Sequence, residues 1–311
     1  MKDKLILVFL GIFAILFMAY PFYQMSLSDA EEPKKVIENK ISQNLKSELE
    51  PEKVFGKQAL NLAFFGLDKT REREETIGSF RTDTIIIMHL NWQENKVYML
   101  SIPRDTYVYV PVINRMDKIN HAFPYGGGED GNGFASSMAT IENFLGIKID
   151  HYIGLDMEAI APLVEAAGGV TMAVDLDLDE GDCHLVKGQT QLLNGKMADL
   201  YVRYRYTGRG DIDRIQRQQR FLQAFLNQAG EKVTVEKSLQ LYEKIRPMTH
   251  TDMTIPQLMA LGYYFKKLDP GNIEGSLIEG SFMNKNGISY WKPNLQQQKP
   301  IIEKVFGLTK I

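Results

Sequence analysis

The sequence predicts an α/β fold, in which one folded domain over residues 58–311 follows an N-terminal transmembrane helix. Three observations indicate this organisation. An uncharged apolar run stands near the N-terminus, strand-like and helix-like segments alternate from Leu60 onward, and glycines end several of the helical segments. The composition, 44% apolar and 24% charged, is that of an ordinary folded chain and excludes a disordered or fibrous protein.

The N-terminal apolar run is the candidate membrane anchor. It comprises the nineteen uncharged residues 5–23, which as a helix would reach about 28 Å and just cross a hydrocarbon core. A cleavable signal peptide is the alternative, but the run is longer than a usual signal core and lacks a clear small-x-small cleavage site. Lys2 and Lys4 precede it, so the positive-inside rule predicts a single-pass membrane protein with a cytoplasmic N-terminus and an extracytoplasmic domain.

The segment that follows the anchor is charge-rich. Residues 24–57 contain few apolar side chains and carry prolines at Pro33 and Pro51. This pattern predicts a partly helical stalk between the anchor of residues 1–23 and the folded domain.

Strand signals come first in the domain. Residues 60–66, 83–90 and 97–102 are rich in β-branched and aromatic side chains, and the turn-like segment Asn91-Trp-Gln-Glu-Asn joins the last two. We therefore expect these two strands to form a hairpin.

Helical signals alternate with the later strands. Residues 134–145 and 157–167 have helical apolar spacing and end at glycine, and a short strand follows each, at 151–155 and at 170–174. A further strand is expected at 200–206. Helices are then expected at 212–228, 235–245 and 256–268, with Pro256 at the first helical position of the last.

Charge and cysteine content exclude several classes of function. The net charge is −3, from 36 Lys and Arg against 39 Asp and Glu, which leaves no basic surplus for general nucleic-acid binding. The single cysteine, Cys183, cannot form an intramolecular disulfide or a thiolate cluster. The five histidines show no His-x-x-x-His spacing, so zinc hydrolysis is not expected. Walker A and Gly-x-Ser-x-Gly sequences are absent too, and the Gly-x-Gly-x-x-Gly match at Gly126 follows no hydrophobic strand.

Arginines are concentrated in one part of the chain. Six of them lie between residues 203 and 220, a stretch without lysine. Guanidinium groups make bidentate bonds to phosphate oxygens, so this cluster predicts an oligo-anion site. Arg203 and Arg205 would share one face of the expected strand, and Arg214 and Gln218 one flank of the following helix. The alternative is a solvated basic face that pairs with the neighbouring aspartates.

Two carboxylates stand at expected strand ends. Asp68 ends the first strand and Asp83 opens the second. Carboxylate oxygens at such edges suit Mg²⁺, which completes its coordination with water and substrate phosphates. On spacing alone, a turn role for Asp68 is the alternative.

The end of the third strand adds further charged groups. Arg104 and Asp105 follow Pro103, and Asp117-Lys-Ile-Asn supplies Lys118. Acidic and basic groups thus alternate at several strand ends, as metal-assisted phosphoryl transfer requires. Asp105 is the candidate general base, and a salt-bridge role for it is the alternative.

The motifs that carry these residues resemble the LytR-CpsA-Psr family of Gram-positive cell-envelope proteins. The resemblance covers residues 61–228, and its motifs are Phe65-Gly-Leu-Asp, Phe80-Arg-Thr-Asp-Thr, Ser101-Ile-Pro-Arg-Asp, Asp117-Lys-Ile-Asn-His-Ala, Gly168-Gly-Val, Arg203-Tyr-Arg and Gly210-Asp-Ile-Asp-Arg-Ile-Gln-Arg-Gln-Gln. It implies an α/β/α-type sandwich with a central mixed sheet and an apolar groove for a prenyl chain. It also implies a membrane phosphotransferase that moves wall teichoic acid or capsular polysaccharide from a polyprenyl-pyrophosphate carrier to peptidoglycan.

The resemblance also implies roles for individual residues. Asp68 and Asp83 would hold Mg²⁺, and catalysis would involve Arg81, Arg104, Asp105, Arg203 and Arg205. The pyrophosphate would be bound by the same arginines together with Lys118, Arg214, Arg217 and Gln218. Asp213 departs from the family pattern, which often has a small residue there; it would either tether Arg214 or cap the helix.

Two other functions compete with the transferase. A non-enzymatic receptor for polyprenyl pyrophosphate or for the polymer would use the same arginines without a metal-binding carboxylate pair. An RNA-binding module could use the arginines and tyrosines of residues 201–206, but an extracytoplasmic domain argues against a nucleic-acid partner.

Overall fold

The computed structural model describes residues 48–69, 80–204, 206–207, 213, 217, 220–221, 224, 245–268 and 272–306. The predicted anchor, most of the predicted stalk, and the candidate site residues Arg205, Arg214 and Gln218 lie outside these ranges. Within the described part of the chain, no helix is both long and apolar enough to cross a membrane.

A six-stranded sheet forms the centre of the domain, with the strand order β11-β6-β1-β2-β3-β12. Its strands are β1 (Ala59–Leu67), β2 (Thr82–Asn91), β3 (Lys96–Ser101), β6 (His151–Asp156), β11 (Thr249–Thr251) and β12 (Ile273–Leu277). The pairs β1–β6 and β3–β12 are parallel, whereas β1–β2, β2–β3 and β6–β11 are antiparallel. The predicted mixed α/β fold with a central mixed sheet is therefore confirmed, and so is the β2–β3 hairpin.

Alternation along β1 divides the interior into two cores. Leu60, Leu62 and Phe64 contribute to the first core, while Phe65 and Leu67 contribute to the second. Successive side chains of a strand point to opposite faces, so this largely apolar strand contributes to a core on both faces of the sheet. Helices therefore have to cover both sides.

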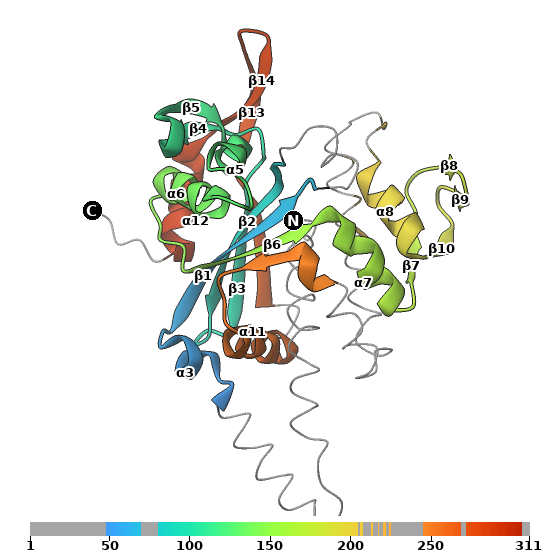
Figure 1. Cartoon of the computed structure of the whole chain (residues 1–311), viewed down its shortest axis with the longest axis horizontal. Coiled ribbons are helices and arrows are strands. Elements are labelled where there is room, and N and C mark those ends of the chain that lie inside the picture. Colours follow the sequence, from blue (N-terminus) through green and yellow to red (C-terminus); the bar gives the residue numbers. More distant parts are fainter. Residues whose placement is uncertain are drawn as a thin grey trace, which may run out of the picture.

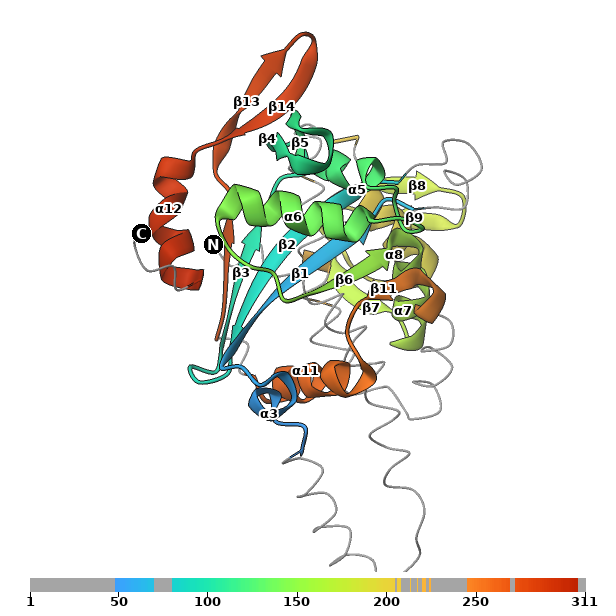
Figure 2. The same ribbon diagram turned by 60° about the vertical axis from the view of Figure 1, so that its left-hand side comes forward.

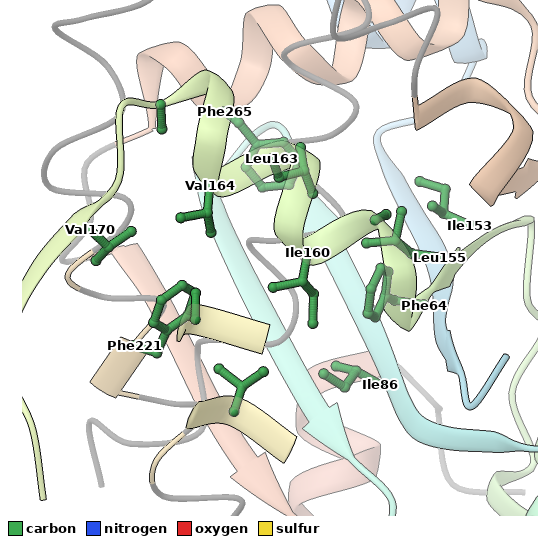
Figure 3. Packing of buried hydrophobic residues seen from close by; sticks show 14 of the residues in the cluster. Phe64, Ile86, Ile153, Leu155, Ile160, Leu163, Val164, Val170, Phe221 and Phe265 are labelled. Atoms are coloured by element: carbon green, nitrogen blue, oxygen red, sulfur yellow. The ribbon is translucent and has the colours of Figure 1, made fainter. Parts of the chain in front are cut away.

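The first core lies under α7 (Ile160–Ala166), α8 (Gly195–Arg203) and α11 (Ile255–Lys267). Figure 3 shows side chains of the α7 residues Ile160, Leu163 and Val164 in this core, together with Phe64 and Ile86 of the sheet. The helix α3 (Pro51–Phe55) joins the same side, where the Phe55 ring stacks on Trp92 at a centroid distance of 5.8 Å.

The second core lies under α5 (Ala122–Tyr125), α6 (Gly133–Leu145) and α12 (Leu295–Phe306), as Figure 1 shows. Phe134 of α6 stacks on Tyr152 at 4.4 Å between centroids, and it passes directly over Gly154 of β6. A Cβ at Gly154 would lie 2.6 Å from the Phe134 ring, so the close approach of α6 to the sheet requires glycine there.

Four two-stranded sheets occur in addition among the described residues of the domain. They are formed by β4 (Tyr107–Val110) with β5 (Arg115–Lys118), β7 (Val170–Ala173) with β10 (Thr190–Leu193), β8 (Leu178–Glu180) with β9 (Cys183–Leu185), and β13 (Gly280–Lys285) with β14 (Ile288–Pro293). Short 3₁₀ turns occur at η2 (Pro111–Ile113), η3 (Ile119–His121), η4 (Met157–Ala159) and η5 (Arg246–Met248). The β13–β14 hairpin projects from the domain next to β4 and β5, at the end opposite α3 (Figures 1 and 2).

The sequence expectation of a strand at residues 200–206 was wrong. Residues 200–203 belong to α8, whose N-terminus is capped by Asn194, with the Asn194 side-chain oxygen accepting a hydrogen bond from the Met197 N–H at 2.9 Å. Ala198, Tyr201 and Val202 recur at helical spacing and are buried in the first core. The inference that Arg203 and Arg205 share a strand face is thereby also wrong.

The predicted helices are confirmed where the structure describes them. The expected helix at 134–145 is α6, that at 157–167 is η4 followed by α7, and that at 256–268 is α11 with a proline in its first turn. The described residues between 213 and 224 have helical backbone, as expected. The helix expected at 235–245 falls almost entirely outside the described residues.

Candidate active site

The candidate site lies where β1 ends and β2 begins. The two strands pair Gly66 with Thr84 and Leu67 with Thr82, so Asp83 is the extra residue of a β-bulge. Beyond the bulge, the Asp68 N–H donates to the Arg81 carbonyl oxygen at 3.0 Å and extends the pairing. Asp68 and Asp83 therefore come from the adjoining ends of one strand pair.

Four charged residues at this edge form a continuous chain of ion pairs. Arg104, at the end of β3, donates from Nη1 to Oδ2 of Asp83. The Arg104 Nε is 3.9 Å from the Asp105 Oδ2, and the Asp105 Oδ1 is 2.7 Å from the Lys118 Nζ. We call Asp83, Arg104, Asp105 and Lys118 the charged chain. The structure thus joins four of the residues that the sequence analysis selected separately.

Backbone contacts fix the position of Lys118 relative to β3. The Asn120 N–H donates to the Arg104 carbonyl oxygen at 3.3 Å, and the Ile119 N–H donates to the Thr106 carbonyl oxygen at 2.9 Å. The short β4–β5 hairpin is therefore tied to the strand end that carries Arg104.

Asp117 supports this hairpin from inside. Its carboxylate accepts hydrogen bonds from the Lys118 N–H at 2.8 Å, from His121 Nδ1 at 3.1 Å and from the Tyr125 hydroxyl at 3.1 Å. Burial raises the pKa of Asp117, but the hydrogen bonds and the charge of His121 together lower it below its ordinary value. Burial lowers the pKa of His121 against the opposing effect of Asp117, and the charges of Arg81 and Lys118 lower it further.

Arg203 lies apart from the charged chain, on the side of the first core. It is the last residue of α8, and its Nε donates to Oδ1 of Asp199, one helical turn earlier, at 2.6 Å. Burial raises the pKa of Asp199, although the positive charge of Arg203 opposes this effect.

Arg217 is wholly buried beside α8, with 0% of its side chain exposed. Its Nε donates to Asp175 Oδ1 at 3.3 Å and its Nη1 to the Tyr204 carbonyl oxygen at 2.6 Å, and the guanidinium lies over the Tyr201 ring. Among the described residues, its buried Nη2 has no hydrogen-bond partner. This guanidinium therefore retains a donor for an oxygen ligand.

Asp175 holds the arginines of this side in place. It accepts a hydrogen bond from the Tyr201 hydroxyl at 2.6 Å and also pairs with Arg220. Burial raises the pKa of Asp175, but the Tyr201 hydroxyl and the two arginines lower it by more, so its pKa lies below the ordinary value. Burial and Asp175 both raise the pKa of Tyr201.

The sequence analysis missed a second group of charged residues beside Asp68. Glu129, Asp156 and His250 place one ligand atom each within 4.8 Å of one another, a spacing that could hold a metal ion. Lys69 Nζ is 2.7 Å from Glu129 Oε2 and 4.0 Å from Asp156 Oδ2, so one ammonium group lies near both carboxylates and offsets part of their negative charge. Asp156 ends β6 opposite Leu67, and the strand-end argument applied to Asp68 could have found it. No sequence spacing connects it to Glu129 or His250.

The chain is similar to known proteins in sequence. Residues 21–306 match the LytR_cpsA_psr family. A protein of Oceanobacillus iheyensis named polyisoprenyl-teichoic acid–peptidoglycan teichoic acid transferase TagU is 34% identical over 236 residues, which are 76% of this chain and 71% of that protein.

Solved structures resemble the fold as well. The crystal structure of B. subtilis TagV is 28% identical and superposes with a TM-score of 0.63 over 82% of this chain and 99% of that chain. The structure of TagT bound to LI-WTA is 25% identical, with a TM-score of 0.61 over 81% of this chain and 92% of that chain.

Proposed function

The chain belongs to the LytR_cpsA_psr family, and from this premise we propose that it is a phosphotransferase of the cell envelope. It transfers an anionic glycopolymer, of the wall teichoic acid or capsular polysaccharide type, from a polyprenyl-pyrophosphate carrier to peptidoglycan. The similarity to a polyisoprenyl-teichoic acid–peptidoglycan teichoic acid transferase supports this proposal, and TagT, a structural relative, was solved with LI-WTA bound.

The charged chain is the observation that carries this proposal. Phosphoryl transfer depends mainly on positioning and on neutralising the charge of the phosphates, because the protein itself does little covalent chemistry. Arg104 and Lys118 are held beside Asp83 and Asp105 at one sheet edge, where two cations can face phosphate oxygens. These residues come from β2, the end of β3 and β5, so the fold and not one local motif builds the arrangement.

In the proposed reaction, a hydroxyl of the acceptor sugar attacks the phosphorus on the polymer side of the pyrophosphate. The bond from that phosphorus to the bridging oxygen breaks, and polyprenyl phosphate leaves with the bonding electron pair. The hydroxyl proton passes to a base, for which Asp105 remains a candidate. Its two ion pairs, with Arg104 and Lys118, also fit the alternative role of holding those cations in place.

Asp68 and Asp83 fit a Mg²⁺ ion in this proposal. They supply carboxylates from adjoining strand ends, and Mg²⁺ commonly takes one or two protein carboxylates and completes its shell with phosphates and water. When bound, the ion would neutralise charge that develops on the phosphates.

The arginines on the α8 side complete the proposed diphosphate site. Arg217 offers its Nη2, and Arg203 stands at the C-terminal end of α8. Arg205, Arg214 and Gln218 keep their roles in the proposal through their positions in the family motifs.

We also propose the location that the sequence predicts. Residues 5–23 anchor the chain in the cell membrane with the N-terminus cytoplasmic, and the domain faces the peptidoglycan.

An Asp83→Asn variant tests the transferase. The substitution keeps the side-chain shape but removes the charge that pairs with Arg104, so transfer of polymer from a prenyl-pyrophosphate donor to peptidoglycan should fall by about a hundredfold or more. Asp182→Asn, at an aspartate whose side chain is 96% exposed, is the matched control and should transfer normally. Melting curves of both proteins show whether the fold is retained.

One result would contradict the metal-assisted mechanism, and another would contradict the assignment as an enzyme. Undiminished transfer by folded Asp83→Asn, or in the presence of a chelator, would contradict metal-assisted catalysis. Binding of the prenyl-pyrophosphate donor by the wild-type chain without any transfer would favour the non-enzymatic receptor instead.

A further inference from the structure

We propose that the outer face of the β4–β5 hairpin and the adjoining face of the β13–β14 hairpin bind the glycan strand of the acceptor. This inference rests on the proposed function, which requires an acceptor sugar hydroxyl to reach the charged chain. We call the surface formed by the following side chains the acceptor surface: Tyr107, Tyr109, Met116 and Ile288. The Tyr290 side chain is buried and supports this surface by packing against Tyr107.

Strand alternation directs the side chains of β4 and β5 outward. Val108 and Val110 are buried in the second core, so Tyr107 and Tyr109 point to the other face. Their antiparallel partners, Lys118 and Met116, lie on this same face. Tyr109 is 39% exposed and Met116 is 44% exposed, which makes this face an exposed patch of large apolar groups.

The β13–β14 hairpin continues the patch. Met283 pairs with Tyr290 and Lys285 with Ile288, so these four side chains share one face of the hairpin. The Tyr290 ring packs against the Tyr107 ring at 4.9 Å between centroids, and Lys285 Nζ donates to the Tyr107 hydroxyl at 2.6 Å. Ile288 is 49% exposed beside the turn.

The acceptor surface begins at the charged chain. Lys118 Nζ lies 2.7 Å from Asp105 Oδ1 and 5.6 Å from the centre of the Tyr290 ring. The Trp291 N–H donates to the Asp105 carbonyl oxygen at 2.8 Å, which fixes the base of the projecting hairpin to the same segment. A polymer lying along the surface would therefore lead directly to the proposed reaction centre.

The chemistry of the surface fits a glycan. A sugar ring has apolar C–H faces and a rim of hydroxyls, and tyrosine offers an aromatic face and a hydroxyl in the same side chain. The cations of Lys118 and Lys285 lie near the rings of Tyr290 and Tyr107, at 5.6 Å and 5.0 Å from the ring centres, where they can attract the carboxylates that peptidoglycan carries.

The position of the surface supports the same occupant. The arginines proposed for the donor, Arg203 and Arg217, lie at or beside α8, whereas β4 packs Val108 and Val110 into the second core. A glycan on the acceptor surface would therefore reach the diphosphate site from the side away from α8. Figures 1 and 2 show the two hairpins at the end of the domain opposite α3, which lies in the last part of the predicted stalk. In the proposed membrane topology, this end is free to face the wall.

Co-sedimentation with purified sacculi freed of attached polymer tests the inference. The full chain is used in detergent and carries Asp83→Asn, so that binding is measured without transfer. A Tyr109→Ala/Ile288→Thr variant removes two exposed contacts, and its Kd for sacculi should rise about tenfold. In the transfer-competent chain, the same pair of substitutions should raise the KM for polymeric acceptor and leave kcat nearly unchanged.

Phe282→Ala is the matched control. Phe282 is 74% exposed, but it pairs with Trp291 on the opposite face of the same hairpin, so sacculus binding should not change. Melting curves of both variants should coincide with that of the parent, because all three substituted side chains are exposed.

Several outcomes would overturn the inference. The first is that the Tyr109→Ala/Ile288→Thr variant binds sacculi as well as the parent does. The second is that Phe282→Ala weakens sacculus binding equally. The third is that the Tyr109→Ala/Ile288→Thr variant loses binding to phosphatidylglycerol vesicles and keeps binding to sacculi. Failure of the proposed function is a different result: sacculus binding would follow the expected pattern, yet the chain would transfer no polymer.

Discussion

Asp175 balances the charge of an arginine that has no contact with water. Arg217 is wholly buried, and its guanidinium donates hydrogen bonds to Asp175 and to the Tyr204 carbonyl oxygen. Removing one partner of a buried ion pair leaves an uncompensated charge. We expect Asp175→Asn to lower the free energy of unfolding by about 3 kcal/mol, towards the low end of such effects because Asp175 is 28% exposed. Urea unfolding beside the Asp182→Asn control measures the difference.

The effect of Asp175→Asn should depend on pH. The pKa of Asp175 is lower in the folded than in the unfolded chain, where it is close to 3.8. Its ionised form therefore adds stability above pH 3.8, and this contribution is lost as the pH falls through the folded-state pKa. The stability difference between wild type and variant should shrink in acid below 3.8. A difference that stays constant down to that range would show that the carboxylate charge is not what holds Arg217.

Arg104 is the arginine at which the need for bidentate bonds to phosphate can be tested most directly. Lysine at this position keeps a positive charge beside Asp83 but cannot make two parallel bonds to phosphate. We expect Arg104→Lys to reduce transfer by ten- to a hundredfold, because a lost charge-assisted bond costs about 1.5–3 kcal/mol. Arg246→Lys, at an exposed arginine of η5, is the control. Equal transfer by Arg104→Lys and wild type would mean that only the charge matters.

At the scale of single residues, the sequence identified those whose position depends on local structure. Asp68, Asp83 and Arg104 stand next to strands that their own neighbours define, so their meeting at one edge could be predicted. The burial of Arg217 could not be predicted from the sequence, because it depends on a contact with Asp175, forty-two positions away in the chain. The group of Glu129, Asp156 and His250 was missed for the same reason, since three separate elements bring these residues together.

At the scale of elements, the packing of α6 on the sheet depends on the missing side chain of Gly154. A Cβ there would meet the Phe134 ring at 2.6 Å, so Gly154→Ala should push α6 outward and cost about 1–3 kcal/mol of stability. Shortening the opposing side chain in Phe134→Leu should relieve the clash. The double variant should therefore be more stable than the sum of the two single effects predicts, and strict additivity in urea unfolding would contradict this account.

Local signals decided which elements could be predicted. The β2–β3 hairpin and α11 were identified because turn residues and a first-turn proline mark them. The error at α8 arose from alternating tyrosines that resemble a strand, although Asn194 supplies a helix cap immediately before it. The β13–β14 hairpin was missed despite Asn286-Gly287, whose positive φ angles of 54° and 79° are what a two-residue hairpin turn needs.

At the scale of the whole molecule, the membrane anchor stays a prediction from residues 5–23 and the two preceding lysines. Protease added to spheroplasts should digest the domain, since it would face outward. A cytoplasmic protein of the same cells is the control for membrane integrity. Protection of the domain in intact spheroplasts, or a mature N-terminus beyond Tyr23, would contradict the anchor.

The order of strands in the sheet also constrains how the chain can fold during synthesis. β1, β2 and β3 are made early and form the middle of the sheet, whereas the outermost strands β11 and β12 come from residues 249–251 and 273–277. Until the ribosome has added these residues, β3 and β6 present unpaired edges that can pair with other chains. Contacts between such distant segments also form slowly. The nascent protein therefore remains open to aggregation and proteolysis almost until its last strands emerge, and truncations that remove β12 should be degraded before they fold.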